Sequence, residues 1–162
     1  MNRTLVLLSC GSPEQIAALH QQAAPTLAAA LGLPLAAPLG EPCQSLQAAV
    51  QVLGSLGQPL LVPLGLDPGR ALPGGGHWAE ALGAGRQCSL LLLTGEQLNG
   101  GSAAAGHALL QRWRVPLLGL VQADGPWDEA ARRSDGLPWL GALDSDSLKL
   151  SSRVRWQQLQ AA

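Results

Sequence analysis

The chain has 162 residues, of which 47% are hydrophobic and 13% are charged, which suits one domain with a sizeable core. Its net charge is −1 without a basic stripe, so nucleic acid is excluded as a partner. The longest apolar runs, such as 90–93, are far shorter than the ~20 residues of a membrane-spanning helix, so a membrane is excluded as well.

The cysteines and the first residues predict the compartment. Cys10, Cys43 and Cys88 lie far apart and form no CxxC motif, so neither a disulfide framework nor a zinc site is indicated. The single early charge, Arg3, leads directly into an apolar run instead of a signal-peptide pattern. We therefore expect a reduced protein of the cytoplasm.

A strand and a helix are predicted first. Residues 4–8 form a continuous apolar run, as in strands that are buried on both faces of a parallel sheet. Ser12-Pro13-Glu14 is a typical helix start, and apolar residues at helical spacing continue to Gly32. We expect Pro25 to kink or split this helix. Residues 33–39 contain two prolines and predict a poorer strand at the sheet edge.

The alternation continues through the middle of the chain. Leu46, Val50 and Leu53 mark a second helix that ends at Gly54 or Gly57. The elements predicted next are a strand over 59–66, the loop "DPGRALPGGG", a short helix around 77–82 and a strong strand over 88–93.

The last third repeats the pattern. The predicted elements are a helix capped by Ser102, a strand over 115–121, a short helix over 127–134 and a short strand over 137–143. Strands that alternate with helices imply βαβ crossovers with helices on both sheet faces. We predict a single doubly wound, three-layer α/β domain over 1–144, with a mostly parallel sheet of five or six strands. Residues 145–162 are expected to be a polar tail with a short helix from Arg153.

In such sheets ligands bind beyond the carboxyl ends of the strands. The polar residues that follow predicted strands are therefore the candidates for ligand binding. They are Ser12, Glu41, Asp67, Arg70, Asn99, Gln122 and Asp124, with Cys10 as a reactive group and Thr94 and Glu96 nearby.

Each candidate also has a structural interpretation. Ser12 is suited to capping a helix, Cys10 to filling a tight turn, and Glu41 to the positive end of the next helix. His77 is the best candidate for acid–base or metal chemistry because imidazole titrates near neutrality. The glycines of "PGGGHW" can turn N–H groups toward an anion, but a lid or a surface loop fits them better.

Lysine is nearly absent, which limits the chemistry. Lys149 is the only lysine, and no Gly-Lys-Ser or Gly-Lys-Thr occurs. A P-loop needs that lysine to reach the β- and γ-phosphates. We therefore do not expect Walker-type hydrolysis of ATP or GTP, and a Schiff-base lysine in a central strand is excluded.

From residue 59 onward, the chain resembles dethiobiotin synthetase and the MinD-type nucleotide-binding family. The segments that carry the resemblance are "LLVPLGLDPG", "GGGHWAEALGAGRQCSLLLL", "EQLNGGSAAAGHALLQRWRVPLLGLVQ" and "GLPWLGAL". The resemblance implies that Asn99 lies near the helix-opening asparagine and that Gln122 replaces the adenine-reading asparagine. The family's P-loop is replaced here by "SCGSPE". The fold is therefore expected to carry over without the ATP chemistry, in a small-ligand-binding or assembly subunit.

The first half is also similar to the small sirohydrochlorin-type chelatases. "LLSCGSPEQ" stands where those begin with a strand ending in His-Gly-Ser, and "LLVPLGLDPG" matches their Val-Pro-Leu strand. The second histidine is missing at the matching place, so His77 would have to substitute for it. Cysteine in place of histidine keeps a metal ligand but changes its softness and pKa. The alternative function is therefore an enzyme that uses Cys10, Glu41 and His77 around a metal or a tetrapyrrole.

Neither the cofactor nor the metal is specified by the sequence. A third interpretation is an interaction protein that self-associates or binds another protein, suggested by the low charge content.

Overall fold

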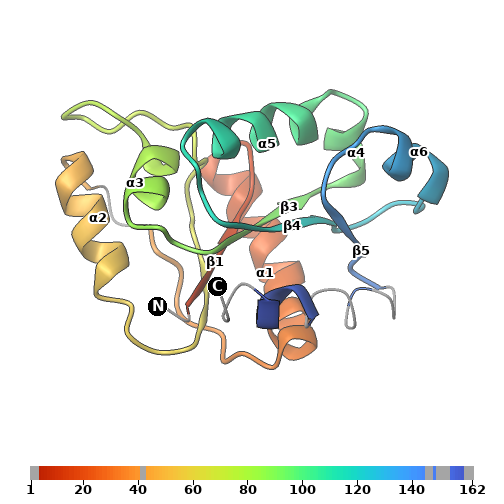
Figure 1. The fold of residues 1–162 in the computed structure, drawn as a ribbon, viewed down its shortest axis with the longest axis horizontal. Helices are drawn as coiled ribbons and strands as arrows, with labels where there is room; N and C mark the ends of the chain where they lie inside the picture. The colour runs from red at the N-terminus through yellow and green to blue at the C-terminus, as the bar shows by residue number, and fades with distance from the viewer. Residues whose placement is uncertain (1–3, 41–42, 145–147, 149–153, 159–162) are drawn as a thin grey trace.

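The computed structural model describes residues 4–40, 43–144, 148 and 154–158 (Figure 1). Its five strands form one sheet in the order β2-β1-β3-β4-β5, and every neighbouring pair is parallel. The strands are β1 (Leu5–Leu8), β2 (Leu61–Pro63), β3 (Ser89–Leu93), β4 (Leu117–Gln122) and β5 (Trp139–Ala142). The predicted α/β class and parallel sheet are confirmed.

Helices cover both faces of this sheet, as the alternating pattern predicts (Figure 1). The helices are α1 (Pro13–Leu31), α2 (Leu46–Gly54), α3 (Trp78–Ala84), α4 (Gly95–Leu98), α5 (Ser102–Arg112) and α6 (Glu129–Ser134). Residues 154–158 are also helical, and Trp156 packs against the apolar cluster to which α1 contributes. None of the helices in the described residues is long and apolar enough to cross a membrane.

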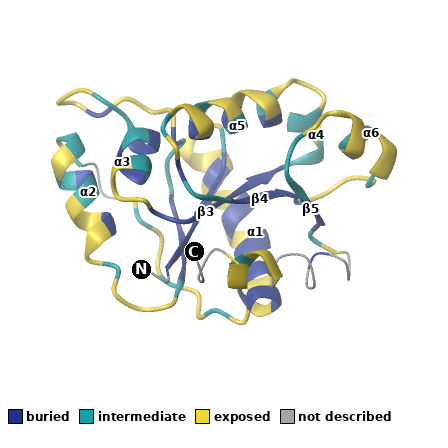
Figure 2. Cartoon of the chain, in the orientation of Figure 1, coloured by how far each residue is buried: buried dark blue, intermediate teal, exposed yellow. Residues whose placement is uncertain are grey.

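Two apolar clusters lie on opposite sides of the sheet. On one side α1 packs against Leu5, Leu7 and Leu90, and Leu148 and Trp156 of the tail join this cluster. On the other side α2, α3 and α5 pack against the strand residues that point the other way, because successive strand side chains alternate between faces. Figure 2 shows the strands as the buried layer between the helices. The predicted three-layer arrangement follows from these two cores.

The structure corrects the prediction for residues 33–39. Only Leu35 and Leu39 form isolated parallel bridges, to Leu61 and Leu64, so this segment is not a regular strand. Pro34 and Pro38 have no N–H group to donate, which interrupts the ladder. The predicted edge position is correct, because the segment lies on the outer side of β2.

Helix α1 runs without a break through Pro25, so the prediction that Pro25 splits it is wrong. Proline removes one N–H donor, which leaves the Gln21 carbonyl without its usual partner. Both residues are exposed, so water can hydrate that carbonyl.

The helices α4 and α5 also differ from the prediction. The N-cap of α5 is Gly101, and Ser102 is the first helical residue. The one-turn helix α4 was not predicted, because the sequence places only four residues between its N-cap Thr94 and its C-cap Asn99.

The order of the strands determines where a ligand site would lie. After β1 the chain crosses to β2 on one side, and the remaining strands are added on the other side, beginning with β3. The strand order therefore reverses between β1 and β3. The carboxyl ends of these strands form the crevice in which open α/β sheets bind ligands.

Candidate functional site

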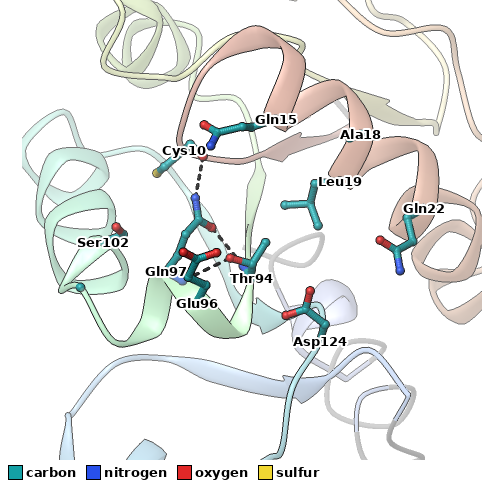
Figure 3. A pocket seen from close by; sticks show the side chains of 11 residues that line it. Cys10, Gln15, Ala18, Leu19, Gln22, Thr94, Glu96, Gln97, Ser102 and Asp124 are labelled. Atoms are coloured by element: carbon teal, nitrogen blue, oxygen red, sulfur yellow. Dashed lines mark hydrogen bonds between the residues drawn. The ribbon is translucent and has the colours of Figure 1, made fainter.

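A pocket of about 530 Å³ lies at this crevice. We call it the rim pocket. One wall comes from α1 and the other from the segment that joins β3 to α5, and Asp124 closes it from beyond β4 (Figure 3). Its polar lining side chains are Gln15, Gln22, Thr94, Glu96, Gln97, Ser102 and Asp124, and Cys10 is also part of the lining.

The turn after β1 is fixed by hydrogen bonds from two directions. Ser12 caps α1 and forms a capping box with Gln15, as Ser-x-x-Gln spacing allows. The N–H of Gly11 donates to Asp67 Oδ2 at 2.8 Å, and the N–H of Gly69 donates to Oδ1 at 2.8 Å. Gly11 has a φ of +129°, a conformation that favours glycine. Asp67 thus ties the β1 turn to the loop after β2.

The opposite wall is built in the same way. Thr94 caps α4 and forms a capping box with Gln97. The side chain of Gln97 also donates to the carbonyl oxygen of Cys10 at 2.7 Å (Figure 3). This bond connects the turn after β3 to the turn after β1, so the two walls of the crevice are held at a fixed separation.

The loop after β4 is organised around Gln122 and Asp124. Gln122 is buried, and its Nε2 donates to the carbonyl oxygens of residues 124–126 at 2.9–3.1 Å. The side-chain N–H groups of Gln122 are therefore already used in hydrogen bonds within the loop after β4. Asp124 Oδ1 accepts the N–H of Gly95 at 2.6 Å and also lines the rim pocket.

Cys10 is the thiol of the rim pocket. Burial, and then the negative charge of Asp67, raise the pKa of Cys10 from 9.0 to about 11. Its sulfur also lies close to α5 at Gly106, where a β-carbon would be 3.3 Å from Sγ. The thiol therefore stays protonated at neutral pH and is a poor nucleophile and a poor metal ligand in this state.

His77 does not line the rim pocket. It is the N-cap residue of α3, and its ring packs edge-on against Trp113 with the ring centroids 5.3 Å apart. Its Nδ1 is buried and has no hydrogen-bond partner among the described residues. The structure therefore places Cys10 and His77 in different surroundings.

The other predicted site residues are spread along the same edge of the sheet. Arg70 is exposed and lines a separate pocket of about 290 Å³ with Cys43 and Trp78. Asn99 is the exposed C-cap residue of α4 and is not part of the rim pocket. Glu41 lies outside the described residues. The roles predicted for these residues stay predictions.

Within the described part of the chain, no group of three or more histidine, cysteine, aspartate or glutamate side chains is placed to hold a metal ion.

The sequence did not single out the amide side chains of the rim pocket. Gln15 and Gln97 each stand three residues after a capping hydroxyl, and this spacing was the available signal. Gln22 and Ser102 carry no such signal, because their place in the pocket depends on how α1 and α5 pack.

The charge of the rim pocket is one-sided. Glu96 and Asp124 line it, and none of the lining residues in the described part of the chain is basic. A carboxylate accepts hydrogen bonds and attracts cations, but it repels phosphate. The pocket is therefore suited to ligands that donate hydrogen bonds or carry positive charge.

Comparison of the chain with protein-family models, with curated proteins and with solved structures gives no match.

Proposed function

We propose that this chain is a small-ligand-binding protein without ATP hydrolysis, a P-loop-lacking relative of the dethiobiotin synthetase type, and that its ligand occupies the rim pocket. The observation that carries this proposal is the lining itself: two carboxylates and several amides, with no basic side chain among the described residues that form it. Nucleotide sites instead surround the phosphates with lysine, arginine or N–H groups.

The pocket favours a compact amine. Glu96 and Asp124 supply negative charge, while Gln15 and Gln22 of α1 offer both donors and acceptors from the other wall (Figure 3). A cationic ligand placed between them gains charge-assisted hydrogen bonds. The raised pKa of Cys10 is in keeping with a binding role, since a protonated thiol does not attack a substrate.

The test uses three probes with one carbon skeleton: 1,3-diaminopropane, 1,3-propanediol and malonate. Calorimetric titration is expected to show the tightest binding for the diamine, weaker binding for the diol and none for malonate. Glu96→Gln is expected to weaken diamine binding about tenfold, the loss of one charge-assisted bond. Glu129→Gln, which removes an exposed charge from α6, is the control and should leave binding unchanged.

Titration with ATP and magnesium is the second arm. We expect neither binding nor turnover. Preferred binding of malonate, or micromolar ATP binding with hydrolysis, contradicts the proposal. The low charge content also suggested an interaction protein that self-associates. Size-exclusion chromatography with light scattering tests that interpretation.

A further inference from the structure

A second pocket lies on the other flank of α1. It has a volume of about 340 Å³ and is bounded by α1, by residues 35–38 and by the end of β2. We call it the His20 pocket. Its lining is almost entirely apolar, and the residues used below are Ala17, His20, Ala24, Pro25, Leu35 and Pro63.

Among the described residues that line this pocket, His20 is the only one with an ionisable side chain. Its side chain is buried, with 4% of the residue exposed, and its Nε2 lies 2.9 Å from the hydroxyl oxygen of Ser9. Ser9 is completely buried at the end of β1. Among the described residues, Nδ1 of His20 has no hydrogen-bond partner. Nδ1 is not among the fully buried side-chain atoms that lack a partner in the described residues, so it keeps some exposure where His20 lines the pocket and can bond to a molecule bound there.

The Ser9 hydroxyl determines which ring nitrogen carries the proton. Its hydrogen is buried and needs an acceptor, and Nε2 of His20 is the one that the described structure offers. When Ser9 donates to Nε2, the neutral imidazole carries its proton on Nδ1. The unpartnered atom of the pocket is therefore an N–H donor.

We propose that the His20 pocket binds a small, neutral, largely apolar molecule with one acceptor oxygen, which receives a hydrogen bond from Nδ1 of His20. The apolar lining supplies the affinity and the imidazole supplies the orientation, as in other small-molecule sites. This site is separate from the rim pocket and does not depend on the function proposed for it.

Three features agree with this ligand class. Burial lowers the pKa of His20 from 6.5 to about 4, so the ring is neutral at pH 7 and does not require an anionic ligand. A cavity of about 150 Å³ already holds benzene, so a volume of about 340 Å³ accommodates a fused bicyclic molecule. Leu35, at the pocket wall, is 43% exposed, and a bound apolar molecule would cover part of that surface.

The test compares 1-indanone with indane, two bicyclic molecules that differ by one carbonyl oxygen. Calorimetric titration at pH 7 is expected to show both binding, with 1-indanone about tenfold tighter, the effect of one hydrogen bond. Nitrogen-15 NMR of the His20 ring should show the Nδ1–H tautomer, and its Nδ1 signal should shift with 1-indanone but not with indane. Equal affinities, no binding of either probe, or an Nε2–H tautomer would overturn the proposal.

Two alanines of α1 provide matched variants. Ala17 lines the pocket and Ala29 does not, and both are exposed, so either can be enlarged without disturbing the core. Ala17→Leu is expected to weaken binding of both probes about tenfold by filling the pocket, while Ala29→Leu leaves it unchanged. Equal effects of the two variants contradict the location. Asp124→Asn in the rim pocket should not change 1-indanone binding, which separates this site from the proposed function.

Discussion

Helix α1 separates two pockets of opposite chemistry. Gln15 and Gln22 line the rim pocket, whereas Ala17, His20 and Ala24 line the His20 pocket. Residues of one helix face different directions because each step turns the chain by about 100°. The partner elements complete the contrast: the rim pocket receives carboxylates from the turns after β3 and β4, and the His20 pocket receives Leu35, Ala36 and Pro38 from the segment outside β2. The ligand that each pocket can accept is therefore decided mainly by what packs against α1.

The end of β1 divides its side chains in the same way. Ser9 is directed to His20, and the next residue, Cys10, lines the rim pocket. Successive residues of an extended chain point to opposite sides, so this arrangement needs no special loop. Cys10 and His20 are both neutral at pH 7, mainly because burial raises the pKa of Cys10 and lowers the pKa of His20. Cys10 therefore changes charge only at high pH, and His20 changes charge only at low pH.

The largest expected effect is acid destabilisation through His20. Its pKa is about 4 in the folded protein, against 6.5 as the ordinary value, so the unfolded chain binds the proton more readily. The contribution to stability is fully present above about pH 6.5 and is lost as the pH falls toward 4, up to about 3 kcal/mol. Urea unfolding at a series of pH values measures this slope.

Histidine variants assign the slope to one residue. His107→Gln is the control on α5 and should keep the pH dependence, whereas His20→Gln should flatten it between pH 4 and about 6.5. If His20→Gln does not fold, the NMR titration of the His20 ring in the wild-type chain gives the answer. A His20 ring that titrates near 6.5 contradicts this prediction.

The sequence was sufficient to predict the α/β class and the parallel sheet. Continuous apolar runs at 4–8 and 88–93 could only be buried strands, and each lies at the predicted place. The sequence was insufficient where prolines acted through tertiary context. Pro25 lies on the exposed side of α1, so its missing hydrogen bond was tolerated, whereas Pro34 and Pro38 stood where a ladder needed donors.

The candidate sites were predicted less completely. Of the residues predicted after the strands, Cys10, Thr94, Glu96 and Asp124 line the rim pocket, whereas Ser12, Asp67, Arg70, Asn99 and Gln122 do not. The Ser9–His20 pair had no signal, because a histidine in the middle of an alanine-rich helix is typical of a structural residue. Its partner is 11 positions earlier, and only the packing of α1 on β1 brings the two together.

A smaller effect concerns the thiol on the other flank. With a pKa of about 11, Cys10 has about 100-fold less thiolate at pH 8 than an unperturbed cysteine. Both thiols are partly exposed and burial raises the pKa of each, but the charge of Asp67 acts in addition on Cys10, so iodoacetamide should modify Cys43 before Cys10. Mass spectrometry of the alkylated peptides against time measures the two rates. Faster labelling of Cys10 than of Cys43 would show that its thiol is activated, and would favour the enzyme alternative.

The smallest effect tests the tie between the β1 turn and the loop after β2. Asp67→Ala removes the acceptor of the Gly11 and Gly69 N–H groups. Both bonds are exposed, so water replaces the carboxylate and the free energy of unfolding should fall by only about 1 kcal/mol. Asp128→Ala is the matched control, because Asp128 caps α6 by accepting the N–H of Ala131 and its loss also costs about 1 kcal/mol.

The two aspartate variants differ in what they do to Cys10. The charge of Asp67 helps to raise the pKa of that thiol, so Asp67→Ala should speed the alkylation of Cys10, whereas Asp128→Ala should not. Burial is the larger cause and remains in both variants, so Cys10 should still react more slowly than Cys43. An unchanged Cys10 rate in Asp67→Ala would mean that burial alone keeps the thiol neutral. In that case Cys10 would be unreactive because α5 packs against it at Gly106, and the charge of Asp67 would not contribute.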